Sequence, residues 1–150
     1  MRVVIQRVKE ASVSVDNTII SEIKKGFLIL LGIENDDTEE DVHWLTGKIS
    51  KLRVFSDDND SMNNSIIDVN GDAMVVSQFT LHASTKKGNR PSFIKAARPE
   101  IAIPLYESFI FHLERELDKK VRSGAFGAMM DVALVNDGPV TILIDSKNKD

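Results

Sequence analysis

The feature that most constrains the fold is the unbroken apolar run FLILLGI at residues 27–33. A strand in a sheet with one face in water alternates apolar and polar residues, and this run does not. Such a strand has to be covered on both faces. We therefore expect residues 27–33 to form the centre of a sheet that is buried on both sides.

The segments around this run predict further strands. Residues 3–15 alternate with a period of two up to an Asp16-Asn17 turn, and residues 18–23 return as the next strand. Residues 53–56 form a short strand. Residues 66–69 and 73–83 are expected to form a hairpin around Asn70-Gly71, which is a type I′ turn signal. Two final strands, 131–136 and 140–145, are expected on either side of Asp137-Gly138-Pro139.

Two segments have the periodicity of amphipathic helices. Val42, Leu45, Ile49 and Leu52 form one apolar stripe, and Thr38 with Asp41 resembles a capping box at its start. The second helix is expected over roughly residues 99–117. Pro104 favours a later start within this range, because proline is tolerated only in the first turn of a helix. Strands in blocks with only two helices disfavour a regular doubly wound sheet. We therefore expect an α/β fold with one mixed sheet, or with mixed β-sheets in two layers (β/β/α), and with the two main helices on one side.

Length and composition exclude several classes of protein and of chemistry. The 150 residues fit a single domain, 1–150, and the absence of cysteine excludes disulfides and thiolate chemistry. A net charge of −4 excludes a basic coat over the whole protein. The apolar runs are too short for a membrane span, and the N-terminus lacks the long apolar stretch of a signal peptide. We expect a cytoplasmic protein with no membrane association.

Metal and nucleotide motifs are not predicted. Residues 57–68 follow a calcium-loop template in part, but position six is Met62 rather than glycine and position twelve is Asp68 rather than glutamate. His43, His82 and His112 show no ligand spacing, and neither a Walker loop nor a dinucleotide fingerprint is present. We therefore expect no metal and no cofactor.

The strand at 73–83 becomes polar on one face, where Gln78, Thr80 and His82 follow Met74 and Val76. Such a strand end either opens into a cleft or simply reaches solvent, and the pattern leaves both open. Ser77 and Thr80 are three residues apart, so a regular strand sends them to opposite faces. Either a bulge brings them together, or one of them acts through its backbone or is purely structural.

The loop after this strand carries a concentrated positive charge. Residues 86–98 contain Lys86, Lys87, Arg90, Lys95 and Arg98 and no acidic residue. A positive segment on an acidic protein fits either a phosphate-binding surface or a solvated loop. Phe93 in this segment either stacks on a base or fills the core.

Several motifs together closely resemble the D-aminoacyl-tRNA deacylases, the D-Tyr-tRNA deacylase family. They are IQRVKEASVSV at 5–15, SQFTLHA at 77–83, KKGNRPSF at 86–93, FGAMM at 126–130 and LVNDGPVT at 134–141. The resemblance covers essentially the whole chain. Three flanking positions, Ser84, Met129 and Ile142, depart from the commonest family pattern.

The resemblance implies a homodimer that hydrolyses the ester joining a D-amino acid to tRNA, a form of chiral proofreading, and that also acts on glycine misplaced on alanine tRNA. It implies that the pocket is lined by Ser77, Gln78, Phe79 and Thr80. It further implies that a cis Gly138-Pro139 pair reaches into the partner's pocket and rejects L-amino acids. Lys86, Lys87 and Arg90 are the expected tRNA phosphate contacts.

The chemistry of an aminoacyl ester agrees with these residues, because an activated ester needs positioning and oxyanion donors rather than a catalytic triad. The family resemblance implies assistance by the 2′-hydroxyl of the tRNA and by backbone N–H groups of residues 77–80, and we favour this over nucleophilic attack by Thr80, for which His82 is the one candidate base. Two alternatives stay open. One is a non-catalytic RNA-binding dimer that uses only the basic segment, and the other is a hydrolase of small D-amino acid esters that uses only the pocket.

Overall fold

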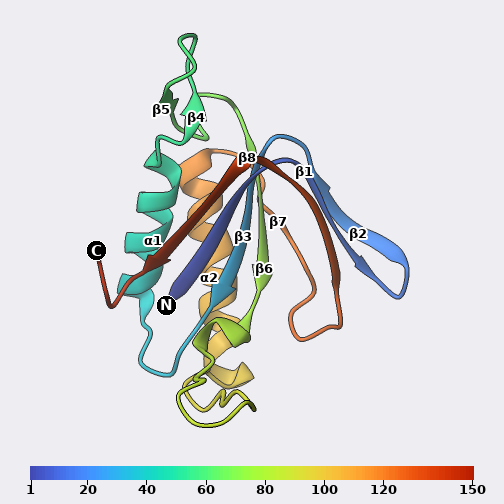
Figure 1. Ribbon diagram of the computed structural model, residues 1–150, viewed down its shortest axis with the longest axis vertical. Helices are drawn as coiled ribbons and strands as arrows, with labels where there is room; N and C mark the ends of the chain where they lie inside the picture. The colour runs from blue at the N-terminus through green and yellow to red at the C-terminus, as the bar shows by residue number, and fades with distance from the viewer.

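The computed structural model describes residues 1–150 and is built around one bent sheet with two helices (Figure 1). The sheet is mixed, as expected. Its strand order is β2-β1-β3-β6-β7, and β8 pairs with the other edge of β1. The elements in chain order are β1 (Arg2–Val15), β2 (Thr18–Ile23), β3 (Gly26–Gly32), α1 (Glu39–Lys51), β4 (Phe55–Ser56), β5 (Met62–Asn64), β6 (Asp72–Ser77), the 3₁₀ helix η1 (Phe79–His82), α2 (Pro99–Leu117), β7 (Arg122–Ser123) and β8 (Asp131–Asp145).

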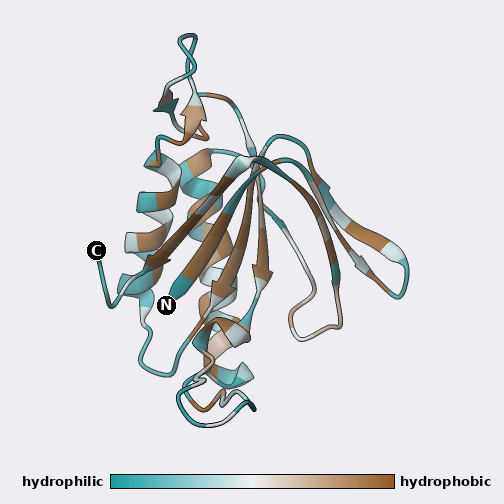
Figure 2. Ribbon diagram, viewed as in Figure 1, coloured by the Kyte–Doolittle hydropathy of each residue, from teal (hydrophilic) through white to brown (hydrophobic).

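Strand β3 lies between β1 and β6, at the centre of the sheet, which confirms the prediction from its apolar run. Its side chains alternate between two buried clusters. Phe27, Ile29 and Leu31 pack on the helix side of the sheet, and Leu28 packs on the opposite side. Figure 2 shows the hydrophobic strands gathered in the middle of the molecule. The run is uniformly apolar because both faces of this strand are covered.

The second face is covered by the sheet itself, because β1 and β8 bend together (Figure 1). The β1–β8 register shifts on both sides of Val8. Before the bend, Val3 and Ile5 belong to the cluster under the helices; after it, Ala11 and Val13 belong to the second cluster. The molecule therefore has a helix layer, a central sheet and a folded-over sheet layer, which confirms the β/β/α arrangement.

Both helices form as the sequence predicts and cover the same face of the sheet (Figure 1). Helix α1 begins with the expected capping box, in which Thr38 and Asp41 satisfy each other's backbone N–H groups. Helix α2 spans Pro99–Leu117, which confirms the predicted bounds, and Pro104 does not move its start to a later residue. Proline at the first helical position lacks only an N–H that would have no helical partner, and α2 continues through Pro104.

The predicted hairpin around Asn70-Gly71 is also wrong. Residue Asn70 has the positive φ of a turn, but the chain then enters β6, which runs parallel to β3 and β7. The short antiparallel pair in this region is β4 with β5 instead. A turn signal thus predicts the local backbone correctly but does not decide which strand the chain pairs with afterwards.

Two strand boundaries differ from expectation. Strand β6 ends at Ser77 rather than at residue 83, because η1 begins at Phe79. The segments 131–136 and 140–145 form one strand, β8, rather than two strands joined by a turn. None of the helices is both long enough and apolar enough to cross a membrane.

Candidate active site

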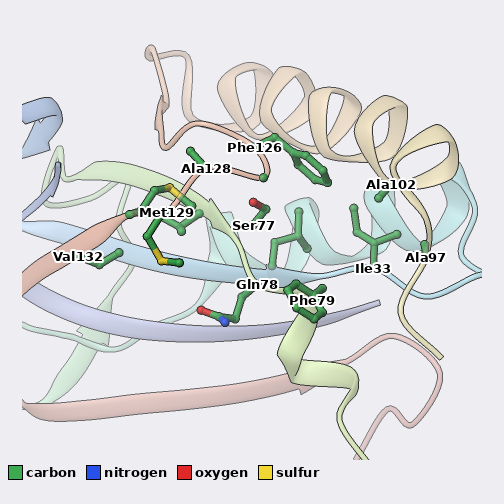
Figure 3. A pocket seen from close by; sticks show the side chains of 14 residues that line it. Ile33, Ser77, Gln78, Phe79, Ala97, Ala102, Phe126, Ala128, Met129 and Val132 are labelled. Atoms are coloured by element: carbon green, nitrogen blue, oxygen red, sulfur yellow. The ribbon is translucent and has the colours of Figure 1, made fainter. Parts of the chain in front are cut away.

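A pocket of about 380 Å³ opens where β3 and β6 end (Figure 3). Eleven of its 14 lining residues are hydrophobic, so the pocket is a largely apolar cleft. Its walls come from the ends of β3 and β6, the start of α2, the 126–130 loop and the start of β8. The lining residues are Leu31, Ile33, Val76, Ser77, Gln78, Phe79, Ala97, Ala102, Phe126, Gly127, Ala128, Met129, Met130 and Val132.

Three of the four residues predicted for the pocket line it. Ser77 and Gln78 are half-buried and Phe79 is 56% exposed at the rim, whereas Thr80 is exposed and lies outside the lining set. In Figure 3 the Ser77 side chain lies on the side of Phe126 and Ala128. The segment therefore opens into a cleft at Ser77 and Gln78, whereas Thr80 reaches solvent.

The change from strand to 3₁₀ helix settles how Ser77 and Thr80 are related. Neither a bulge nor a regular strand is present, since β6 ends at Ser77 and η1 follows. The Gln78 side-chain amide donates a hydrogen bond of 2.5 Å to the Thr80 hydroxyl. The first N–H groups of η1, on Phe79 and Thr80, have no acceptor within the helix itself. N–H groups without a helical acceptor are the type of donor that can stabilise an oxyanion, so these two are candidate oxyanion donors.

The position of η1 is fixed by the strands beneath it. The Gln78 N–H donates to the Leu31 carbonyl at 2.8 Å, and the Arg2 guanidinium donates to the Leu81 carbonyl at 3.0 Å. A Cβ atom on Gly32 would lie 2.8 Å from the Cβ of Leu81, so only glycine permits this approach. The segment carrying the candidate oxyanion donors is therefore held from two sides.

Tyr106 on α2 supports the opposite wall. Its hydroxyl donates to the Val75 carbonyl at 3.2 Å, two residues before Ser77, and its ring lies edge-on to Phe126, with centroids 5.4 Å apart. Burial raises the pKa of the Tyr106 hydroxyl, which keeps it protonated as a donor. One side chain thus joins the helix, the end of β6 and the loop that closes the pocket.

His82 makes no hydrogen bond to Thr80 in this structure. It is only 2% exposed, and neither ring nitrogen has a hydrogen-bond partner. Its nearest charged neighbour is the Glu34 carboxylate, 3.6 Å from Nδ1. A general base must lie within hydrogen-bond reach of the proton that it removes. The geometry therefore leaves Thr80 without the side chain that would activate it as a nucleophile.

The basic loop lies beside the pocket. Ser84 and Ser92 exchange backbone hydrogen bonds of 2.8 and 2.9 Å, which close the base of the loop carrying Lys86, Lys87 and Arg90. All three cations are exposed. Phe93 neither fills the core nor stands free, because it packs edge-on against Phe79 at 5.1 Å. This aromatic pair joins the basic loop to the pocket rim.

The Gly138-Pro139 pair lies at the bend of β8 and does not line the pocket of its own chain. The peptide bond between these residues is cis, and both residues are exposed. The β1–β8 pairing passes from Asn136 directly to Thr141, so the ladder is interrupted here, as expected where proline offers no N–H. The pair therefore projects from the sheet at a point separate from the pocket.

The comparisons with known proteins agree with these motifs. The family model for D-Tyr-tRNA(Tyr) deacylase matches residues 4–145. The chain belongs to the D-Tyr-tRNA(Tyr) deacylase family. Proteins named D-aminoacyl-tRNA deacylase from Flavobacterium johnsoniae and Porphyromonas gingivalis are 63% and 65% identical to it over the full length of both chains. The predicted family resemblance is confirmed.

Solved structures share the fold of this family member. One described as c-Myc DNA Unwinding Element Binding Protein is 40% identical, with a TM-score of 0.90, and the match covers 97% of this chain and 98% of that chain. Another, described as a probable eukaryotic D-amino acid tRNA deacylase, is 17% identical with a TM-score of 0.82, and the match covers 95% of this chain and 97% of that one. The second likeness concerns the fold alone.

One residue of this deacylase-family chain was missed by the sequence analysis. Arg7 of β1 is only 11% exposed; it donates to the Val54 carbonyl at 2.6 Å and to the Asp137 carbonyl at 3.0 Å. It therefore holds the residue just before Gly138. The sequence pattern could have indicated this role, because Arg7 continues the series of alternate residues Val3 and Ile5, whose side chains face the core. A charged residue at such a position needs a buried partner.

Proposed function

We propose that this chain hydrolyses the ester bond of D-aminoacyl-tRNA, releasing the D-amino acid and free tRNA. The observation that carries the proposal is its full-length match to relatives named D-aminoacyl-tRNA deacylase, at 57–65% identity. Residues 1–150 act as a single deacylase domain. A cytoplasmic location follows from the proposed tRNA substrate, and the proposed chemistry requires no cofactor.

The proposed chemistry uses positioning rather than a covalent intermediate. Water adds to the ester carbonyl, and the N–H groups at the start of η1 stabilise the resulting oxyanion. The bond from carbon to the ribose oxygen then breaks, and that oxygen takes up a proton. The 2′-hydroxyl of the terminal adenosine is the proposed assisting group, because neither ring nitrogen of His82 hydrogen-bonds to Thr80. Ser77 and Gln78 line the cleft beside the reacting carbonyl.

The substrate's RNA part is proposed to lie along the basic loop. Lys86, Lys87 and Arg90 are exposed, and the contact of Phe93 with Phe79 joins their loop to the rim. Charged side chains here would neutralise phosphates near the acceptor end of the tRNA. The same electrostatic contact cannot read the chirality of the amino acid.

Gly138 and Pro139 are the proposed chiral gate, supplied by the partner in a homodimer. D- and L-aminoacyl groups share every functional group, so a pocket separates them only by an obstacle where the L side chain would point. Glycine has no side chain to exclude, so glycine misplaced on alanine tRNA is also a proposed substrate. Exposed Leu134, Val135 and Leu143 on β8 offer apolar surface for the second copy.

The test compares hydrolysis of D-Tyr-tRNA, L-Tyr-tRNA and a small D-tyrosine ester. A deacylase hydrolyses the first much faster than either of the others. Tight tRNA binding with no hydrolysis would instead show a non-catalytic RNA-binding protein. Equal rates on D-Tyr-tRNA and the small ester would show an ester hydrolase that makes no use of the basic loop.

A further inference from the structure

Helices α1 and α2 run side by side in the same direction on one face of the sheet (Figure 1). Their contacts repeat at every helical turn. The Ser108 hydroxyl donates to the Glu39 carboxylate at 2.5 Å, and one turn later the rings of His43 and His112 meet with centroids 4.1 Å apart. The packing thus brings together two histidines that lie far apart in the sequence.

Each helix contributes two residues four apart to this contact. Glu39 and His43 lie on one face of α1, and Ser108 and His112 lie on the facing side of α2. Pairs at this spacing on facing helices are how helical bundles build metal sites. The ligand atoms of Glu39, His43 and His112 all lie within 4.8 Å of one another.

We propose that Glu39, His43 and His112 bind a divalent transition-metal ion of the zinc class and so join α1 to α2. Two imidazoles and one carboxylate form a donor set typical of zinc, with the fourth tetrahedral position left to water. Ligand atoms of tetrahedral zinc lie about 3.3 Å apart, so the three side chains need to close by about 1.5 Å. Glu39 and His43 are exposed and have room to make this adjustment.

The surroundings favour such an ion. Ser108 holds one oxygen of Glu39 and leaves the other free, which is the role of the outer hydrogen-bonding partners of metal ligands. His112 lies ten residues beyond Ala102 of the pocket, about 15 Å along the helix. The site is therefore separate from the deacylation chemistry.

The chain makes the test unusually direct. It has no cysteine and three histidines, and the third, His82, is buried at 2% exposure. Untagged protein would be titrated with ZnCl₂ by calorimetry, with His43→Ala, His112→Ala and Glu39→Gln as variants. Glu40→Gln is the matched control, because it removes the same charge one residue away from a ligand.

The expected result is one Zn²⁺ per chain, a melting temperature that rises with Zn²⁺ and falls back with EDTA, and no response to Mg²⁺. Each ligand variant should weaken binding about tenfold or more, and Ser108→Ala about tenfold, while Glu40→Gln binds as the parent does. Co²⁺ should give the intense visible bands of a tetrahedral site in the parent and lose them in His43→Ala.

Any one of the following results would overturn the proposal. They are no binding by the parent, unchanged binding by either histidine variant, and one ion per two chains, which would place the metal between copies. Unchanged binding by Glu39→Gln would equally refute the three-ligand site. None of these readouts depends on tRNA hydrolysis, so they leave the proposed function untouched.

Discussion

Replacing Arg7 with methionine should destabilise the protein by about 3 kcal/mol and loosen the bend of β8 that carries Gly138 and Pro139. Methionine retains most of the aliphatic length but none of the donors. The change removes the bonds to the Val54 and Asp137 carbonyls and the ion pair to the Asp137 carboxylate at 3.6 Å. A partly buried hydrogen bond from a charged group contributes about 1.5 kcal/mol net, and two such bonds are lost.

The assay is urea unfolding followed by circular dichroism, at one fixed protein concentration. In a thermal unfolding experiment, a decrease of about 3 kcal/mol in the free energy of unfolding should lower the melting temperature by about 6–12 °C for a chain of this length. Lys9→Met is the matched control, because Lys9 is exposed on the same strand and the charge change is identical. It should alter the free energy of unfolding by less than about 0.5 kcal/mol.

The functional arm measures hydrolysis of D-Tyr-tRNA and L-Tyr-tRNA well below the melting temperature of the variant. If Arg7 positions the gate through the Asp137 carbonyl, the ratio of the D rate to the L rate falls in Arg7→Met. The ratio is unchanged in Lys9→Met. A destabilisation below about 1 kcal/mol would refute the energetic argument. An unchanged ratio in a destabilised variant would refute the positioning argument.

Three further predictions concern separate parts of the molecule. Hydrogen bonds from Ser146, the Thr38 backbone and Lys147 outweigh the opposing effect of burial and lower the pKa of Asp41 from 3.8 to about 2. The ionised carboxylate should therefore contribute about 2 kcal/mol above pH 4, and this contribution should be lost as the pH falls towards 2. Between pH 5 and pH 2 the free energy of unfolding of Asp41→Asn should therefore fall by about 2 kcal/mol less than that of the parent, because the other carboxylates with lowered pKa values titrate in both proteins. Changing Lys86, Lys87 and Arg90 to alanine should reduce the slope of log Kd for tRNA against log salt by about 2–3, measured by filter binding, and an unchanged slope would remove the loop from the interface. Thr80→Ala should keep its deacylation rate within about tenfold of the parent, whereas trapping of an acyl group on Thr80 would establish it as the nucleophile.

The parts of the fold predicted correctly depend on local chemistry. The stripe of Val42, Leu45 and Ile49 and the Thr38–Asp41 cap define α1 within one stretch of chain. The apolar run of β3 predicts burial on both faces without naming what covers it. In each case the residues that form the element are the same residues whose spacing predicts it, so the prediction needs no information about distant parts of the chain.

The features that the sequence did not predict depend on contacts between residues that are far apart in the chain. Nothing near Asn70-Gly71 indicates that β6 will pair in parallel with β3 rather than fold back as a hairpin. The end of β6 is set by η1, which Gly32 and Arg2 hold in place from other strands. The meeting of His43 and His112 depends likewise on the packing of two helices about 70 residues apart.

The two strongest sequence motifs end up apart for a topological reason. The start of β8 contributes Val132 to the pocket, and Gly138 lies six residues further along the same strand. Six residues of extended chain span about 20 Å, and the pairing of β8 with β1 on both sides of the bend fixes that course. The chain would have to break this ladder to bring Gly138-Pro139 to its own pocket. A gate built from these residues therefore requires a second copy, so the proposed chiral selection and the proposed homodimer depend on each other.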